Sequence, residues 1–167
     1  REILASLTRR PGLQDGEEGG SRLTLTSLAA AAAELHGNDR VAVELRVADN
    51  SIEIEPLVPS GPEVLRGVGN LIQNSVQFAR TRVDIKVDWD QTFARIVISD
   101  DGPGFPIPLL ASLGEPYVSG RSGDSNHMSL GIFIAQTLLE RTGASLTFAN
   151  RTGAEVSITW QREGSLN

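Results

Sequence analysis

The chain has 167 residues, 40% of them hydrophobic and 22% charged, which is the usage of one globular domain with a sizeable core. Its 15 basic and 21 acidic residues give a net charge of −6, which argues against a general nucleic-acid binder. The absence of Cys excludes disulfides and thiolate chemistry, and no apolar run approaches the roughly 18 to 20 residues of a membrane span. Without an initiating Met or a signal peptide, we expect a cytosolic piece of a longer protein.

The two ends of the chain differ in composition from its central part. The apolar pattern of residues 1–7 predicts the last turns of an amphipathic helix, and residues 11–20, rich in Gly and charge, predict a linker. We therefore assign residues 1–21 to a helix end and linker, residues 22–162 to one folded domain, and residues 163–167 to a frayed tail.

The first part of the domain predicts a helix followed by a hairpin. Residues 23–36 form an Ala-rich helical pattern that we expect to end at Gly37, because Gly is a frequent C-cap residue. Apolar and polar residues then alternate over residues 41–47, a turn is expected at Asp49-Asn50, and residues 52–54 continue the alternation. This pattern predicts a β-hairpin that ends at the prolines beyond it.

A helical pattern over residues 62–80, with Ser60 as its expected N-cap, organises the rest of the domain. At about 100° per residue, Asn70, Asn74 and Gln77 fall together opposite a broad apolar face. One such Asn ordinarily belongs to a solvated polar stripe, but two Asn at i and i+4, backed by later glycine motifs, favour the floor of a site. The face expected to pack into the core contains Val64, Leu65, Val68, Leu71, Ile72, Ser75, Val76 and Ala79.

Two further hairpins are predicted in the second half of the domain. Residues 83–89 alternate, Asp90-Gln91 turns, and residues 93–99 return. A last hairpin pairs residues 146–148 with residues 156–160. Antiparallel hairpins interleaved with three helices predict an α+β two-layer sandwich, with the helices covering one face of a mostly antiparallel sheet.

The motif Asp100-Asp-Gly-Pro-Gly104 follows directly on a strand that we expect to be buried. A carboxylate at Asp100 can accept hydrogen bonds from an exocyclic amine, and Gly102 and Gly104 let the backbone pass close to a flat ring. A plain Asp-Gly-Pro-Gly turn is the alternative. The motif is not a dinucleotide fingerprint, because no helix opens after its second Gly, and the chain contains no P-loop.

Residues 103–128 predict a long loop of the kind that is usually functional, and residues 129–141 predict a helix. The expected helix start, Ser129-Leu130-Gly131, offers free N–H groups to a polyphosphate, and Gly131 permits close approach. Mg²⁺, which accompanies a triphosphate, takes one or two protein oxygens, and Asn74 can supply one. The alternative for Asn74 is a cap on a neighbouring loop.

These motifs, in this order and spacing, resemble those of the ATP-binding catalytic domain of bacterial sensor histidine kinases, a member of the Bergerat-fold ATPase superfamily. Residues 70–75 look like its N box, Asp100 to Gly104 its first glycine box, and Leu130 to Ile132 the end of its second. Glu115-Pro-Tyr117 resembles the phenylalanine box, and the intervening loop resembles the ATP lid. The resemblance covers roughly residues 22–162 and implies the Bergerat fold, with a mixed, mostly antiparallel sheet.

The resemblance also implies roles for individual residues. Asn70 and Asn74 would be the catalytic residues, with Asn70 contacting phosphate and Asn74 ligating Mg²⁺, while Asp100 would bind the adenine amino group. Tyr117 stands at an aromatic position of the phenylalanine box. The full nucleotide-binding set implied in this way is Asn70, Asn74, Asp100, Gly102, Gly104, Tyr117, Ser129, Leu130 and Gly131.

The implied cofactors are ATP and Mg²⁺, and the implied reaction is γ-phosphoryl transfer to a histidine on a separate dimerisation domain, for relay to a response regulator. Residues 1–7 would be the last turns of that domain. His36 and His127 lack the Glu-x-x-x-Pro context of a phosphoacceptor, so we expect the acceptor to be absent from this chain. We expect a cytoplasmic domain without nucleic-acid or membrane contacts, and leave open whether the parent protein lies in the inner membrane. Residues 131–135 and 137–143 further resemble redox-responsive kinases of the RegB type.

Three departures from the family pattern leave other functions open. Gln77 stands where the family often has Lys, and His127 and Ser129 stand where the second glycine box usually has Gly. These residues favour a degenerate nucleotide-sensing or partner-binding domain as the alternative. A Bergerat-fold ATPase such as gyrase, MutL or a heat-shock chaperone has a general-base Glu at the position of Asn70, so the sequence favours phosphoryl transfer over hydrolysis.

Overall fold

The computed structural model describes residues 21–34, 36, 40–48, 54–113 and 125–162, and for residues 125–129 it describes the backbone alone. Several predicted features therefore lie outside the described residues. They are the helix end and linker of residues 1–20, the C-cap at Gly37, the turn at Asp49-Asn50, the segment Glu115-Pro-Tyr117 and the tail of residues 163–167.

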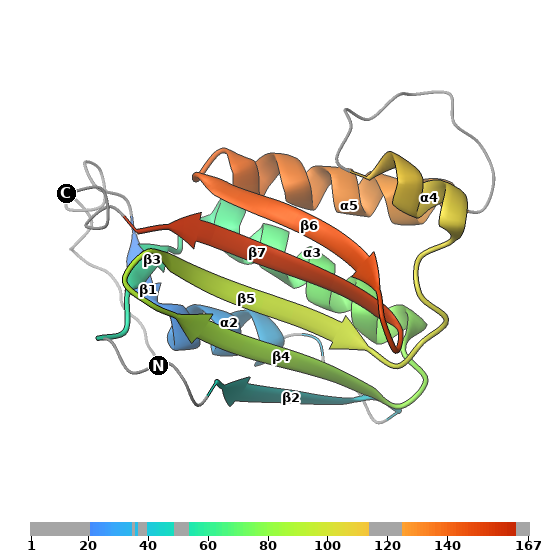
Figure 1. Ribbon diagram of the computed structural model, residues 1–167, viewed down its shortest axis with the longest axis horizontal. Helices are drawn as coiled ribbons and strands as arrows, with labels where there is room; N and C mark the ends of the chain where they lie inside the picture. Colours follow the sequence, from blue (N-terminus) through green and yellow to red (C-terminus); the bar gives the residue numbers. More distant parts are fainter. Residues whose placement is uncertain (1–20, 35, 37–39, 49–53, 114–124, 163–167) are drawn as a thin grey trace.

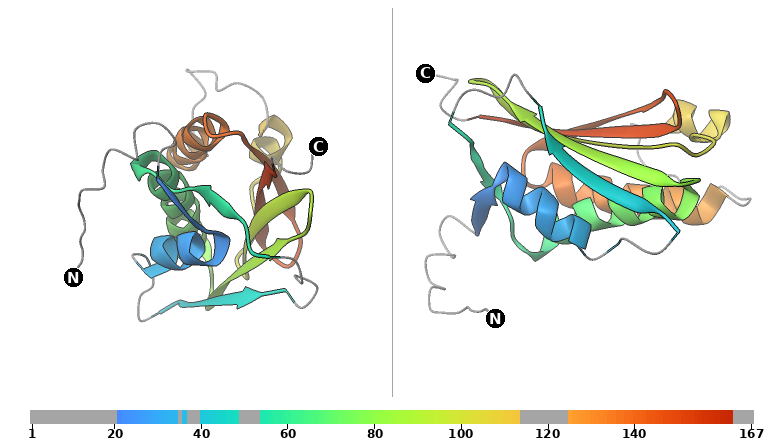
Figure 2. Two further views of the ribbon diagram at one scale, coloured as in Figure 1. Left: turned by 90° about the vertical axis from the view of Figure 1, so that its left-hand side faces the viewer. Right: turned by 90° about the horizontal axis from the view of Figure 1, so that it is seen from below.

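The domain consists of a five-stranded sheet with helices on one face (Figures 1 and 2). The strand order is β2-β4-β5-β7-β6, with β2 parallel to β4 and the other neighbours antiparallel. The predicted α+β two-layer sandwich is therefore confirmed. The strands are β2 (Ala42–Val47), β4 (Arg82–Trp89), β5 (Phe93–Asp100), β6 (Ala144–Asn150) and β7 (Ala154–Gln161).

Three helices cover the sheet, as predicted: α2 (Leu25–Glu34), α3 (Pro62–Phe78) and α5 (Ser125–Glu140). A short helix, α4 (Ile107–Ser112), lies at one end, and β1 (Arg22–Thr24) pairs with β3 (Leu57–Pro59) in a small second sheet. Within the described residues, no helix is long and apolar enough to cross a bilayer.

Helix α3 packs its predicted apolar face into the core between the two layers. Of the eight predicted residues, seven are buried and Leu65 is half-buried. The prediction of Ser60 as the N-cap is wrong, because the cap residue is Gly61 and no side chain caps the helix. Pro62 fits the first helical position because its missing N–H would have no partner there.

Arg40 holds the other end of α3. Its guanidinium donates hydrogen bonds to the carbonyl oxygens of Val76 at 3.0 Å, Ala79 at 2.7 Å and Arg80 at 3.3 Å. The last carbonyl groups of a helix lack partners within the helix, so a cation there satisfies them and also complements the helix dipole.

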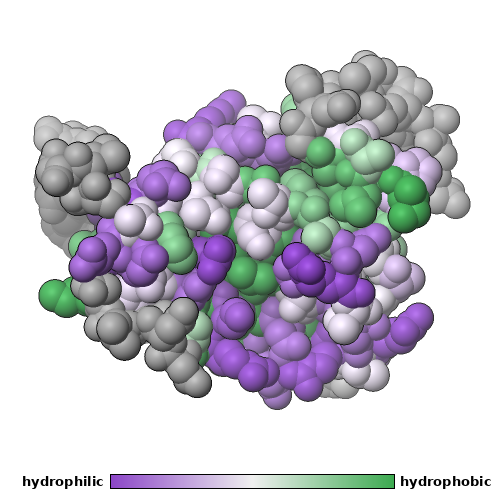
Figure 3. Space-filling view, viewed as in Figure 1, coloured by the Kyte–Doolittle hydropathy of each residue, from purple (hydrophilic) through white to green (hydrophobic). Residues whose placement is uncertain are grey.

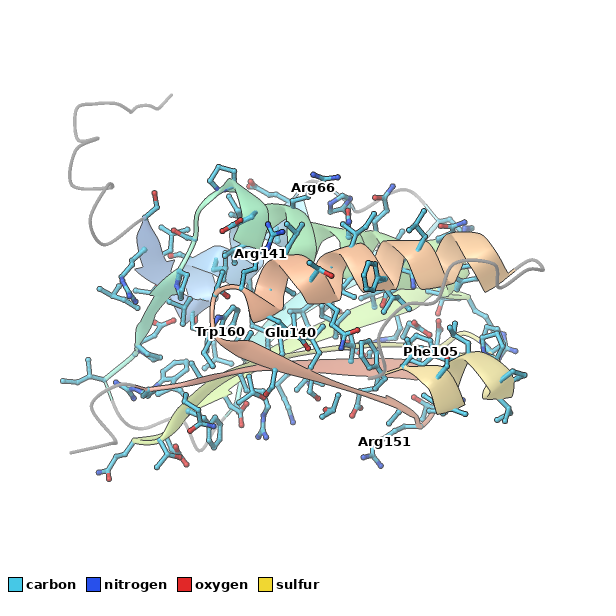
Figure 4. The ribbon with its side chains drawn as sticks, turned by 90° about the horizontal axis from the view of Figure 1, so that it is seen from above. Arg66, Phe105, Glu140, Arg141, Arg151 and Trp160 are labelled. Atoms are coloured by element: carbon cyan, nitrogen blue, oxygen red, sulfur yellow. The ribbon has the colours of Figure 1, made fainter. Side chains whose placement is uncertain are left out.

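Replacing Arg40 with Ala is therefore expected to lower the free energy of unfolding by about 1.5 to 3 kcal/mol, the usual contribution of hydrogen bonds to a charged group. Urea unfolding measures this change. Arg66 on α3 points away from the domain (Figure 4) and is exposed, so Arg66→Ala is the control and should change stability by no more than about 0.5 kcal/mol. Equal effects of the two substitutions would contradict the capping role.

The first predicted hairpin is wrong. Residues 42–47 do form a strand, but β2 pairs in parallel with β4, with Val43 opposite Val83, and Ile54 lies in no strand and is 86% exposed. Parallel neighbours need a crossover connection, and here the chain passes through β3 and α3 before it returns as β4. Alternation predicts a strand without specifying its partner, so it cannot distinguish a hairpin with the next apolar segment from a parallel pairing with a distant strand.

The other two hairpins are confirmed. In the first, β4 pairs with β5, with Val87 opposite Ile96, and in the second, β6 pairs with β7, with Leu146 opposite Ile158. Their alternating apolar residues point toward the helices and are buried. The observed registers agree with this alternation, because a shift by one residue would turn every apolar side chain to solvent.

Helix α5 begins four residues earlier than predicted, at Ser125 rather than Ser129. Gly131 consequently lies in the second turn of the helix rather than in the first. Ser is a favourable residue at a helix start, so residue type could not decide between the two positions. The predicted long loop over residues 103–128 also contains α4.

The outer face of the sheet is covered by paired charges. Arg82 lies 2.6 Å from Asp84 and 3.0 Å from Glu44, and Arg95 lies 2.7 Å from Asp88 across two strands. Figure 3 shows purple and white side chains over most of this face, with some green between them, and apolar side chains gathered at the α4 end, where Ile107 is 71% exposed. The face opposite the helices therefore needs no further layer to cover apolar surface.

Candidate functional site

A pocket opens between the helix layer and the end of β5, and its free space, open solvent at the mouth included, is about 380 Å³. Asn74 on α3 and Asp100 at the end of β5 both line it, so their predicted convergence on one cavity is confirmed. What the cavity binds remains a prediction at this stage. The lining residues are Leu71, Asn74, Ser75, Phe78, Asp100, Gly104, Phe105, Ile132, Ala154, Glu155 and Val156.

Asp100 is the buried acceptor of this pocket, with only 5% of the residue exposed. Its Oδ1 accepts hydrogen bonds from the N–H groups of Gly102 at 2.8 Å and Ala154 at 3.2 Å, and the hydroxyl of Ser75 on α3 also bonds the carboxylate. Burial nevertheless raises the pKa of Asp100, because desolvation outweighs the effect of these donors. These donors fix the orientation of the Asp100 carboxylate, which lines the pocket.

Asp101, the next residue, has a structural role rather than a place in the pocket. Its carboxylate accepts hydrogen bonds from the N–H groups of Arg80 at 2.8 Å, Thr81 at 3.0 Å and Arg82 at 3.3 Å, and from the Thr81 hydroxyl at 2.6 Å. These bonds hold the pKa of Asp101 well below its usual range. Asp101 therefore ties the segment between α3 and β4 to the end of β5, and was not singled out from the sequence.

The glycines of the Asp100–Gly104 motif are required by contacts within the protein. A Cβ on Gly102 would lie 2.2 Å from the carbonyl oxygen of Phe78, and a Cβ on Gly104, whose φ is +88°, would lie 2.8 Å from Oδ1 of Asn150. The sequence predicts that both glycines let the backbone pass close to a flat ring. The structure supplies another reason, namely that neighbouring backbone and side-chain atoms already fill those positions.

Gly153 is part of the same packing and was not singled out from the sequence. A Cβ there would lie 2.3 Å from the backbone oxygen of Asp100, 2.7 Å from its Oδ1 and 2.8 Å from the nitrogen of Gly102. The β6–β7 hairpin can therefore press against the carboxylate only with Gly at this position. No local sequence signal distinguishes such a glycine from any other turn glycine.

The remaining predicted site residues are placed as follows. Asn70 lies one turn before Asn74 on α3 and is half-buried, but it is not among the lining residues, and Gln77 is exposed. On α5, Leu130 is 45% exposed and Gly131 is half-buried. Tyr117 and the side chain of Ser129 lie outside the described residues.

Gly131 differs from the glycines of the β5 motif. Within the described part of the chain, a Cβ at Gly131 would meet no atom within 4 Å, and its φ is not in the left-handed region. Protein packing in this part therefore does not explain the glycine, whereas the close approach of a ligand to the helix backbone would. The predicted free N–H groups at residues 129–131 are wrong, however, because α5 begins at Ser125 and these residues lie inside the helix, and neither Leu130 nor Gly131 is among the residues that line the pocket.

The donor set also fits a magnesium ion that is shared with a nucleotide. Among the described residues, no group of three or more His, Cys, Asp or Glu side chains is placed to hold a metal. Mg²⁺ usually keeps several waters and takes one or two protein oxygens together with substrate phosphates. The half-buried carboxamide of Asn74 at the pocket is one such oxygen donor.

Comparison with known proteins gives the family. Residues 60–164 match the family described as histidine kinase-, DNA gyrase B-, and HSP90-like ATPases. The chain is 36% identical to the sensor histidine kinase RegB of Cereibacter sphaeroides over 96% of this chain and 39% of RegB. The narrower resemblance to the RegB type is thus confirmed at the level of sequence, although the chain spans well under half of that relative.

Solved structures agree on the fold. A mycobacterial sensor histidine kinase, MprB, superposes with a TM-score of 0.65 at 21% identity, covering 84% of this chain and 97% of that one. A nucleotide-free catalytic domain of the histidine kinase ThkA has a TM-score of 0.65 at 17% identity, covering 84% and 96%. The chain belongs to the family of histidine kinase-, DNA gyrase B- and HSP90-like ATPases, as a catalytic ATP-binding domain of the sensor histidine kinase type.

Proposed function

We propose that this chain binds ATP with Mg²⁺ in the pocket between α3 and the end of β5, and donates the γ-phosphoryl group to a histidine on the dimerisation domain of its parent protein. A response regulator would then receive the phosphoryl group, and the domain would act in the cytoplasm. The observation that carries the proposal is the meeting of Asp100 and Asn74 at one cavity in a chain of this family.

Asp100 would recognise the base. An ionised carboxylate only accepts hydrogen bonds, so it suits the exocyclic amine of adenine and opposes a carbonyl oxygen at the same place. Because two backbone N–H groups already hold Oδ1, the orientation of the carboxylate is set before the nucleotide arrives. Pre-organised acceptors of this kind lose little entropy on binding.

Asn74, Asn70 and Gly131 would serve the phosphate end. The carboxamide oxygen of Asn74 would hold the metal, Asn70 would contact phosphate, and the open backbone at Gly131 would let the phosphates approach α5. When bound, ATP supplies the phosphoryl group and Mg²⁺ neutralises its charge. Phosphoryl transfer depends mainly on positioning and charge stabilisation, so no nucleophile from this chain is needed.

The described residues support transfer to an external acceptor rather than hydrolysis. Asn70 cannot act as a general base, and Glu155, the other acidic residue lining the pocket, is paired with Arg151 at 3.2 Å.

His36 is half-buried, and its Nε2 lies 3.0 Å from the position of a Cβ on Gly69 of α3. Burial lowers the pKa of His36, as expected of a packed, neutral imidazole.

The proposal is tested in two steps. Isothermal titration with a non-hydrolysable ATP analogue should give Mg²⁺-dependent binding with a Kd in the micromolar to submillimolar range. Such a Kd corresponds to a favourable binding free energy of the order of 6 kcal/mol. The chain is then mixed with the detached dimerisation domain of its parent protein, and phosphohistidine is followed with radiolabelled ATP. Absence of binding at millimolar nucleotide would favour the partner-binding alternative, and binding without phosphohistidine would remove the kinase activity from the proposal.

Asp100 also predicts the pH dependence of nucleotide binding. Since burial raises its pKa, the carboxylate becomes protonated at a higher pH than an exposed aspartate, and loses acceptor capacity there. Affinity should therefore fall as the pH is lowered from neutrality toward the ordinary aspartate pKa of about 3.9, and the fall should begin above that value. Titrations across this range should show the fall in the wild type and in Asp84→Asn on the outer sheet face, and a flat profile would contradict it.

Unfolding does not explain such a loss. A carboxyl whose pKa is higher in the folded than in the unfolded state binds its proton more readily when folded, so its contribution to stability improves as the pH falls. Asp100 therefore loses its ligand while its own burial becomes less unfavourable. Far-UV circular dichroism at each pH should show an unchanged fold over the range in which affinity falls.

A further inference from the structure

The side chain of Asn150, at the end of β6, is bonded twice to one distant residue. The N–H of Phe105 donates to Oδ1 of Asn150 at 2.8 Å, and Nδ2 of Asn150 donates to the carbonyl oxygen of Phe105 at 3.0 Å. A carboxamide has a donor and an acceptor side by side, as a peptide group does. Asn150 thus pairs with the Phe105 backbone much as a neighbouring strand would.

Gly104, the residue before Phe105, has a conformation that fits the Asn150 carboxamide. Gly104 has a φ of +88°, and a Cβ on it would lie 2.8 Å from Oδ1, 2.9 Å from Cγ and 3.2 Å from Nδ2 of Asn150. The backbone of Gly104 therefore lies close against the carboxamide. The left-handed conformation and the missing Cβ of this glycine both serve the contact with Asn150.

The other side of Phe105 forms part of the pocket. Phe105 is 6% exposed, lines the cavity together with Gly104, and packs edge-on against Phe148 of β6 with the ring centres 5.9 Å apart. In Figure 4, Phe105 lies where the chain leads into α4. Strand β6 therefore holds Phe105 by its backbone through Asn150 and by its ring through Phe148.

We propose that Asn150 is a positioning residue for the nucleotide, whose carboxamide holds Gly104 and Phe105 in place as one wall of the pocket. It acts through Phe105 and does not touch the ligand itself. The inference rests on the proposed function, namely that this pocket binds ATP. Without the two hydrogen bonds, the backbone of Phe105 would lose its attachment to β6, and part of the binding energy would go into ordering the segment after Asp100.

The test compares Asn150→Ala and Asn150→Asp with the wild-type chain. Alanine removes both bonds, whereas aspartate keeps the acceptor for the Phe105 N–H and places an oxygen against the Phe105 carbonyl. Both variants should bind the Mg²⁺ complex of a non-hydrolysable ATP analogue about tenfold or more weakly. Thr152→Ala is the matched control, because Thr152 lies two residues further along in the same hairpin and is exposed.

Two further measurements distinguish a positioning role of Asn150 from a purely structural one. Affinities are measured well below each variant's thermal midpoint, and amide hydrogen exchange is followed at Phe105 and Gly102. We expect faster exchange at Phe105 in Asn150→Ala, and unchanged exchange at Gly102, whose N–H bonds to Asp100. Weaker binding that merely follows the unfolded fraction, or that Thr152→Ala shares, would overturn the inference.

The inference and the proposed function fail differently. If the wild type binds the analogue and the Asn150 variants bind it equally well, the positioning role is refuted while the function stands. If the wild type does not bind, the proposed function is refuted and the positioning role with it. In that case the exchange rate at Phe105 still shows whether Asn150 holds this segment in solution.

Discussion

Asp100→Asn is expected to weaken ATP binding by about 100-fold or more in a chain that remains folded. The N–H groups of Gly102 and Ala154 donate to Oδ1, so the amide oxygen of the new side chain takes that position. The amino group is then left in the place of the second carboxylate oxygen. A donor would face the donor of the adenine amine, and the charge-assisted bond would be lost.

Isothermal titration of the variant with the Mg²⁺ complex of an ATP analogue measures the effect. Asp84→Asn is the control, since Asp84 lies on the outer sheet face and pairs with Arg82 there. Thermal unfolding should show Asp100→Asn no less stable than the wild type, because a buried, poorly solvated charge has been removed. Affinity within threefold of the wild type would show that Asp100 does not carry base recognition.

Gly153→Ala is expected to lower the free energy of unfolding by about 3 kcal/mol and to disable the site. The added Cβ would lie 2.3 Å from the backbone oxygen of Asp100 and 2.8 Å from the nitrogen of Gly102. Backbone atoms cannot rotate away as a flexible side chain can, so the hairpin and the motif must separate. Asp100 would then lose the N–H bond from Ala154, which orients it.

Gly131→Ala provides the matched comparison, because this substitution should raise the free energy of unfolding whereas Gly153→Ala should lower it. Within the described residues a Cβ there meets nothing, and the position lies inside α5, where Ala is favoured over Gly by up to about 1 kcal/mol. The variant should be more stable than the wild type, yet bind nucleotide more weakly if phosphates approach this backbone. Urea unfolding and titration on both variants separate the two effects, and equal stability changes would contradict the packing argument at Gly153.

The sequence was sufficient wherever a single element decides its own burial. The period of α3 predicted which residues enter the core, and the alternation in β4 and β5 predicted a hairpin with the observed pairing. It was insufficient where the partner is distant. The edge strand β2 shows the same alternation as a hairpin strand, and its parallel pairing with β4 depends on how α3 crosses over the sheet.

The candidate site divides along the same line. Asp100 and Asn74 could be found from the sequence because their chemistry is specific and their motifs are local. Ser75, Asn150 and Gly153 could not, because each acts on a residue that is 25 or more positions away in the chain and is brought near by the sheet. The start of α5 was misplaced because several polar residues before it suit a helix start equally well.

The hydrogen bonds of Asp101 have a consequence for evolution. They bind three successive amides of the segment between α3 and β4 to the end of β5, and this carboxylate is adjacent to the one that lines the pocket. An inserted or deleted residue in this segment would shift α3 relative to β5, and the pocket residues on the two elements would no longer face one another. Descendants of this chain should therefore vary the connection in residue type but not in length.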